Sequence, residues 1–175
     1  MSTKNLSTVL LLIHLFTASC VSKADKSENE ISEIQTNGKQ SSFSVNELMN
    51  TFEMGWDDFD NLVVSKGFGF DKLSNEKDGI YKLYLKGKDY SIVKANLNTF
   101  QKRTIGYGFP SGDEYLSCKS QLKKLGFKFI EQKELGHGNV VLNYLKNNIQ
   151  AQLGTFKEGE ETTYIITLIQ IDLMK

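Results

Sequence analysis

The feature that most restricts the fold of this 175-residue chain is a pattern that occurs twice, with a spacing of about 60 residues. Gly67-Phe68 recurs as Gly126-Phe127, and Tyr84-Leu85-Lys86 recurs as Tyr144-Leu145-Lys146. Two further aromatic positions keep this spacing, Phe70 with Phe129 and Trp56 with Tyr115. A repeat of this length is typical of one supersecondary unit. We therefore expect two tandem units, residues 43–110 and residues 111–175.

Each unit begins with the signals of a helix. Ser44 with Glu47, and Ser111 with Glu114, have the spacing of a capping box. Apolar residues then recur at helical spacing: Leu48, Phe52, Trp56, Phe59, Leu62 and Val63 in the first unit, and Tyr115, Cys118, Leu122 and Leu125 in the second. Gly55 predicts a break, and Gly67 and Gly126 predict the helix ends. We expect a helical hairpin or a single helix at the start of each unit.

Strand-like runs follow each helix. They lie around residues 80–86, 90–97 and 103–109 in the first unit, and 139–146, 149–156 and 162–173 in the second. The last run is apolar on both faces, which is typical of a central strand. The predicted fold class is α+β, with two tandem repeats, each a helix or helical hairpin followed by an antiparallel sheet of three to four strands.

Residues 1–19 have the pattern of a secretory leader, with Lys4 before a short apolar stretch at residues 9–16. Thr17-Ala18-Ser19-Cys20 resembles the lipobox of bacterial lipoproteins. The resemblance implies cleavage before Cys20 and a lipid on that cysteine, which anchors the protein on a membrane of the bacterial cell envelope, with the outer membrane preferred and its face left open. The alternative is an ordinary secretory leader in which Cys20 is incidental.

Residues 20–42 combine that cysteine with a segment rich in Ser, Lys, Glu, Asn and Gln and without aromatic residues. Such a composition buries too little apolar surface to fold, so we expect a flexible tether. About 22 residues of random coil span roughly 25 Å. The tether therefore holds the folded units away from the lipid headgroups.

The layout of two tandem units, each with helices followed by an antiparallel sheet, is similar to that of the β-lactamase inhibitor protein. Half of it resembles the small outer-membrane assembly lipoproteins of the SmpA/OmlA type. Both resemblances concern the arrangement of residues 43–173 only. They imply a protein-binding, inhibitor or assembly role, and they carry no site residues.

The residues that usually carry catalysis or bind metals are scarce. After removal of the leader, His137 is the one histidine and Cys118 the one free cysteine, so we expect no catalytic residues, no metal site and no cofactor. We interpret His137, between Gly136 and Gly138, as a turn residue and Cys118 as a core residue. The 21 basic residues balance the 21 acidic ones, which predicts no nucleic-acid partner.

The leading functional hypothesis is a lipid-anchored module, not an enzyme, that binds a protein partner. Tyr84 and Tyr144 are its candidate binding residues, because they occupy matching positions and tyrosine is enriched in interfaces. The alternative places both rings in the core. Two other hypotheses stay open: a small envelope hydrolase that uses carboxylates between the two repeats, and a structural envelope protein without a specific ligand. The sequence does not predict the oligomeric state.

Overall fold

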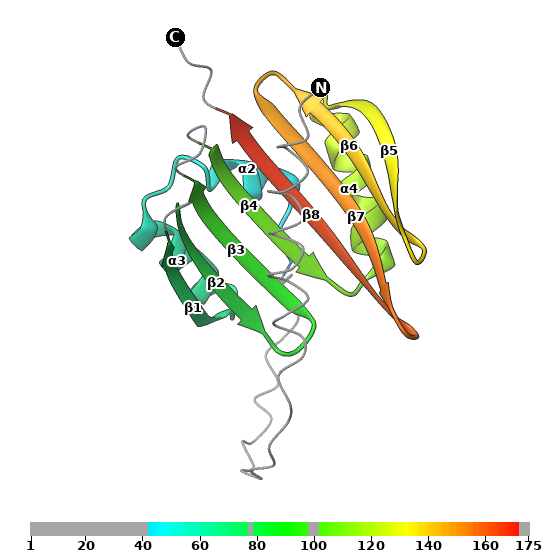
Figure 1. Ribbon diagram of the computed structural model, residues 1–175. Coiled ribbons are helices and arrows are strands. Elements are labelled where there is room, and N and C mark those ends of the chain that lie inside the picture. The colour runs from blue at the N-terminus through cyan, green and yellow to red at the C-terminus, as the bar shows by residue number, and fades with distance from the viewer. Residues whose placement is uncertain (1–41, 77–78, 98–101, 172–175) are drawn as a thin grey trace. The chain divides into compact units, whose positions relative to one another are not determined.

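The computed structural model describes residues 42–76, 79–97 and 102–171 (Figure 1). The predicted leader, the predicted lipidation site Cys20 and the predicted tether up to residue 41 lie outside the described residues. None of the described helices is long and apolar enough to cross a membrane.

The described chain begins with two short helices, α2 (Val45–Asn50) and α3 (Trp56–Ser65). The predicted capping box is confirmed: Ser44 accepts a hydrogen bond from the Glu47 N–H, and the Glu47 carboxylate accepts one from the Ser44 N–H at 2.8 Å. Gly55 is the N-cap of α3, so the predicted break is confirmed as well. The chain leaves α3 through Gly67, whose positive φ of 85° suits a residue without a side chain.

A third helix, α4 (Gly112–Lys124), follows the strand that ends at Phe109. Its predicted capping box forms only in part. Ser111 accepts a hydrogen bond from the Glu114 N–H, but the Glu114 carboxylate accepts one from the Tyr107 hydroxyl at 3.2 Å. This carboxylate therefore joins the helix to the sheet.

The strands are β1 (Gly69–Glu76), β2 (Gly79–Lys86), β3 (Tyr90–Leu97), β4 (Lys102–Phe109), β5 (Lys128–Gly136), β6 (Asn139–Lys146), β7 (Ile149–Glu158) and β8 (Glu161–Ile171). All neighbouring strands are antiparallel. The six predicted runs are confirmed as strands, and β1 and β5 are additional ones. The predicted turn at His137 is confirmed between β5 and β6, with a φ of 53°.

The eight strands form one continuous sheet in the order β1-β2-β3-β4-β8-β7-β6-β5. The predicted α+β class is thus confirmed. β8 lies at the centre between β4 and β7, as the apolar residues on both of its faces predict. The order places the fourth strands of the two halves side by side and the first strands, β1 and β5, at the two edges.

The edge strands share one local geometry. Phe70 of β1 lies opposite Tyr84, and Phe129 of β5 lies opposite Tyr144. In both strands the register shifts directly after the phenylalanine, which is typical of a β-bulge. Each phenylalanine ring also contacts its tyrosine edge to face, at 5.5 and 5.6 Å between ring centres.

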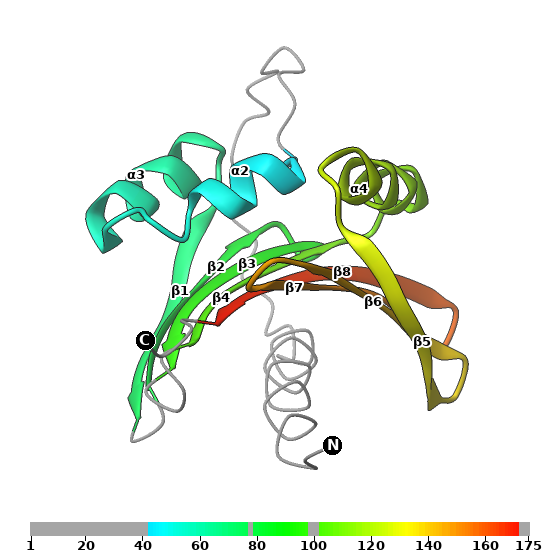
Figure 2. The same ribbon diagram turned by 90° about the horizontal axis from the view of Figure 1, so that it is seen from above.

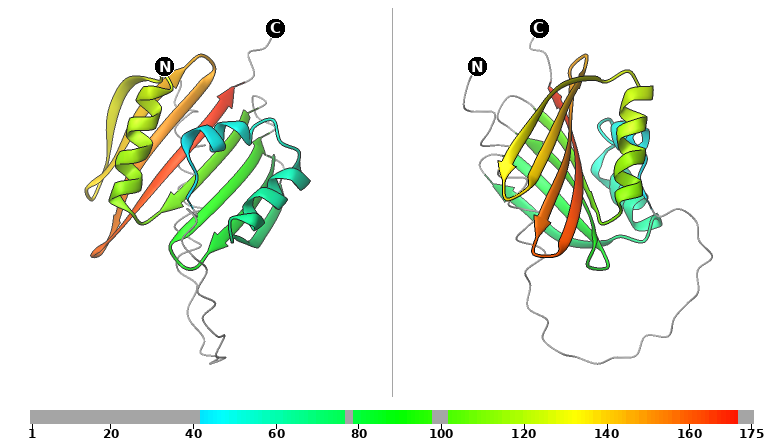
Figure 3. Two further views of the ribbon diagram at one scale, coloured as in Figure 1. Left: turned by 180° about the vertical axis from the view of Figure 1, so that it is seen from behind. Right: turned by 90° about the vertical axis from the view of Figure 1, so that its right-hand side faces the viewer.

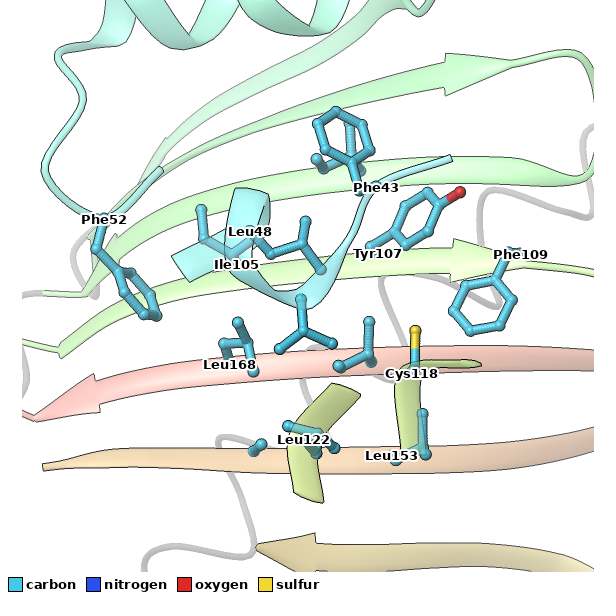
Figure 4. Packing of buried hydrophobic residues seen from close by; sticks show 14 of the residues in the cluster. Phe43, Leu48, Phe52, Ile105, Tyr107, Phe109, Cys118, Leu122, Leu153 and Leu168 are labelled. Carbon is cyan, nitrogen blue, oxygen red and sulfur yellow. The ribbon is translucent and has the colours of Figure 1, made fainter. Parts of the chain in front are cut away.

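The three described helices pack on one face of the sheet, as Figure 2 and Figure 3 show. Figure 4 shows side chains of α2 and α4 above residues of the central strands, with Leu48 and Leu122 among them. Both leucines are completely buried, and each such side chain contributes about 1.5–3 kcal/mol to stability. Gln121 of α4 accepts a hydrogen bond from the Val45 N–H of α2 at 2.8 Å, which joins the two helices.

The other face of the sheet is concave, and no described helix packs on it (Figure 2). Six apolar residues that alternate with the helix-facing ones lie there: Leu83, Val93, Ala95, Val141, Ile165 and Ile169. Each is at most 5 % exposed, although none belongs to the cluster beneath the helices. The sheet therefore has apolar side chains on both faces.

Candidate functional site

The two tyrosines predicted to bind a partner lie on the helix-facing side of the sheet. Tyr84 is 1 % exposed and Tyr144 is 6 % exposed, and both belong to the cluster beneath the helices. This position is the one that the alternative interpretation, core packing, predicts. Their binding role stays a prediction, because their rings could reach a partner only if α3 or α4 moved away.

Tyr84 takes part in a polar cluster that the sequence did not predict. Its hydroxyl donates a hydrogen bond to the Asp60 carboxylate of α3, and the Lys82 ammonium lies 2.6 Å from the same carboxylate. Burial opposes ionisation of Asp60, but the bonds from Lys82 and Tyr84 outweigh it and lower the pKa of Asp60. Burial and the Asp60 carboxylate raise the pKa of Tyr84.

Lys94 of β3 lies next to this cluster and is 3 % exposed. Its ammonium donates hydrogen bonds to the carbonyl oxygens of Thr51, at 2.8 Å, and Met54, at 2.5 Å. The same ammonium lies 5.4 Å from the centre of the Trp56 ring, close enough for a cation–π contact. These carbonyls follow the end of α2 and have no helical partner, so Lys94 holds the connection between α2 and α3. Burial lowers the pKa of Lys94.

A second buried group lies where α4 crosses the sheet. Cys118 is 3 % exposed, and burial together with the Glu114 carboxylate raises the pKa of its thiol to about 12. A thiol with such a pKa is almost entirely protonated at neutral pH and is a poor nucleophile. The prediction that Cys118 is a core residue is confirmed.

The hydrolase hypothesis requires carboxyl groups that are buried together and have raised pKa values. The shifted carboxyls of the described residues are Asp60 and Glu47, and the pKa of each is lowered. Burial opposes ionisation of Glu47, but hydrogen bonds from Ser44 and Lys66 outweigh it. In the described part of the chain no three side chains of His, Cys, Asp or Glu come together as a metal site. No observation here favours the hydrolase hypothesis.

The concave face is a feature that the sequence analysis did not predict. We define its centre by residues that point away from the helices on β2, β3, β4, β8, β7 and β6: Leu83, Val93, Ala95, Thr104, Gly106, Gly108, Val141, Asn143, Gln152, Ile165, Thr167 and Ile169. All of these residues are uncharged. The face therefore presents an uncharged surface that continues across both halves of the sheet.

The polar groups of the concave face differ between its two halves. Leu83 lies opposite Val93 in the first half, whereas the corresponding pair in the second half is Asn143 opposite Gln152. The Gln152 amide donates a hydrogen bond to the Asn143 side-chain oxygen at 3.1 Å. Near the centre of the sheet, the Thr104 hydroxyl is buried and has no hydrogen-bond partner within the described residues. Such a group can bond to a ligand without first breaking a bond within the protein.

The sequence could have indicated this surface in part, because side chains alternate along a strand and the spacing predicts which residues share a face of the sheet. It does not reveal which face the helices cover.

No protein-family model, no curated protein and no solved structure matches this chain. The candidate site therefore rests on its own geometry.

Proposed function

We propose that this protein is a lipid-anchored binding module of the bacterial cell envelope and that its concave face binds a protein partner. The observation that carries the proposal is the lack of charge at the centre of this face, together with its six buried apolar residues. The centres of protein interfaces are depleted of charged residues. The six apolar side chains are at most 5 % exposed, so the feature that favours binding is the absence of charge at the centre of the face and not an exposed apolar patch.

We further propose that the two halves are repeats of one unit. The mirrored strand order and the equivalent positions of Phe70 and Phe129 support this interpretation. The concave face then consists of two related surfaces that differ at several positions, among them the cross-strand pair Leu83 and Val93, which corresponds to Asn143 and Gln152. A partner with an apolar side over the first pair and hydrogen-bonding groups over the second would match it in one orientation.

The anchoring part of the proposal rests on the sequence of residues 17–20 and not on the fold. Two acyl chains suffice for stable attachment to a membrane, since each buried CH2 contributes about 0.8 kcal/mol. The full chain should therefore occur in the membrane fraction, and the Cys20→Ser variant should lose that attachment. A Cys20→Ser variant that stays in the membrane fraction would contradict lipid anchoring and leave the binding role to be tested separately.

The binding role can be tested by photo-crosslinking of the full chain in the cells that produce it. A photoreactive amino acid is placed at Tyr81, which lies opposite Ala95 of the concave face, or at Gln152 in the second half. Both probes should give an adduct of the same mass, identified as the same protein by mass spectrometry. The matched control is a probe at Ser120, an exposed residue of α4 on the opposite side.

The identified protein should also bind the purified full chain when it is produced separately. Adducts at Ser120 alone, or different proteins at Tyr81 and Gln152, would contradict the proposed interface. This outcome does not depend on the lipid, so it separates failure of binding from failure of anchoring.

A further inference from the structure

The edge strand β5 is fully exposed along its length. All nine residues from Lys128 to Gly136 are exposed, and no described strand lies beyond β5 in the sheet. Three of its residues are large and apolar: Phe129 and Ile130 are each 56 % exposed, and Leu135 is 38 % exposed. An edge strand of this kind is a template for pairing with another strand.

The sequence of β5 is complementary to itself in one antiparallel register. When two copies pair around a twofold axis at Gln132, Glu131 of each copy lies opposite Lys133 of the other. Phe129 and Leu135 lie outside this regular stretch, because the register of β5 shifts on both sides of residues 131–134. Opposite charges across neighbouring strands stabilise a sheet.

Neighbouring registers do not have this complementarity. A twofold axis at Glu131 or at Lys133 places two like charges directly opposite each other. Charges on an edge strand normally prevent pairing. On β5 they disfavour the two adjacent registers and favour the one centred on Gln132.

The opposite edge strand, β1, has a different pattern. A twofold axis at Ser74 would place Lys72 opposite Glu76, but it would also place Leu73 opposite Asn75, and the exposed Phe70 lies beyond the bulge between Phe70 and Lys72. In β5, residues 131–134 pair regularly with β6 and lie between two bulges. The regular part of β5 thus coincides with its self-complementary part.

We infer that β5 is an interface between two copies of this chain, which pair edge to edge around Gln132 into a closed dimer with a sheet of sixteen strands. A twofold pairing occupies the β5 edge of both copies, so this contact cannot add a third copy. The interface does not involve the concave face and holds whether or not that face binds a partner.

A disulfide across the twofold axis tests the register. In the full chain, Gln132→Cys should give a dimer on a non-reducing gel after mild oxidation, because directly opposite residues of an antiparallel pair are close enough for a disulfide. The unsubstituted chain sets the background from Cys20 and Cys118, and Asn75→Cys on β1 is the matched edge control. A dimer that forms with Asn75→Cys and not with Gln132→Cys would overturn the inference.

Charge reversal provides a second test that a folding defect cannot imitate. Two tagged copies of the full chain are produced together, and the capture of one by the other is measured. Lys133→Glu paired with itself, or Glu131→Lys paired with itself, should weaken capture by about tenfold or more, since each places like charges opposite each other. Lys133→Glu paired with Glu131→Lys should restore capture, and so should the double reversal in one chain. Equal capture in all combinations, or none in any, would overturn the inference.

Discussion

The ammonium of Lys94 lies 2.8 Å from the carbonyl oxygen of Thr51, and both residues are buried. Lys94 also bonds to the Met54 carbonyl, so one cation from β3 satisfies two carbonyls in the connection between α2 and α3. Arg103 of β4 adds an ion pair to Glu53 of the same connection at 3.0 Å. The position of α3 on the sheet therefore depends on a cation that the sheet supplies.

Lys94→Met keeps the length of the side chain and removes its donors. Two carbonyls then lose their partner, while the cost of burying an ammonium also disappears. We expect a net loss of about 2 kcal/mol in the free energy of unfolding, measured by urea denaturation. The matched control is Lys82→Met on the neighbouring strand, where the ion pair with Asp60 is partly exposed and the expected loss is below about 1 kcal/mol. Equal losses would contradict the role of Lys94.

Tyr84→Phe and Tyr144→Phe compare two equivalent positions. The first removes the hydroxyl that bonds to Asp60, and we expect it to destabilise the protein by about 1–2 kcal/mol. Within the described residues, no protein group bonds to the Tyr144 hydroxyl, so Tyr144→Phe should change stability by less than about 0.5 kcal/mol. The midpoints of thermal unfolding give this comparison. A loss at Tyr144 as large as that at Tyr84 would contradict this account of the two hydroxyls.

The stability of the protein should fall at alkaline pH. Burial raises the pKa of the Cys118 thiol from 9.0 to about 12, and burial also raises the pKa of Tyr107. Above pH 9 the unfolded chain loses these protons while the folded chain keeps them. Fewer protons are then bound in the unfolded state, so the free energy of unfolding decreases with pH between about 9 and 12.

The variant Cys118→Ala isolates the contribution of the thiol. It should be less stable than the unsubstituted protein at pH 7, because a buried atom is lost. Its further loss between pH 9 and 12 should be smaller, because one of the titrating groups is absent. Parallel stability curves for the two proteins would contradict the assignment of a raised pKa to Cys118.

The sequence predicts the order of elements in this fold because local signals determine it. The capping box at Ser44, the break at Gly55 and the turn at His137 each depend on neighbouring residues, and all three are confirmed. The central place of β8 also follows from its own residues. Helix ends and turns are local events in the chain, so a single sequence carries enough information to predict them.

The candidate sites depend on contacts between residues that are distant in the sequence. Asp60 of α3 bonds to Lys82 and Tyr84, which lie more than 20 residues further along the chain on a strand. A lysine in a strand is normally exposed, but Lys94 is buried beneath the connection between α2 and α3. The concave face requires knowledge of which side of the sheet the helices cover. None of these features has a local signal.

The central claim is that the uncharged concave face is the binding surface, and a single charge on that face tests it most directly. Gln152→Glu adds a carboxylate there with little change in shape, and Ser120→Glu adds the same charge on the outside of α4 as a control. The measurement is the yield of the partner adduct from a photoreactive probe at Tyr81 in the full chain. We predict that Gln152→Glu lowers the yield at least about tenfold, since burying an unpaired carboxylate in an interface is costly, and that Ser120→Glu leaves it unchanged. An equal yield from both variants would contradict the claim.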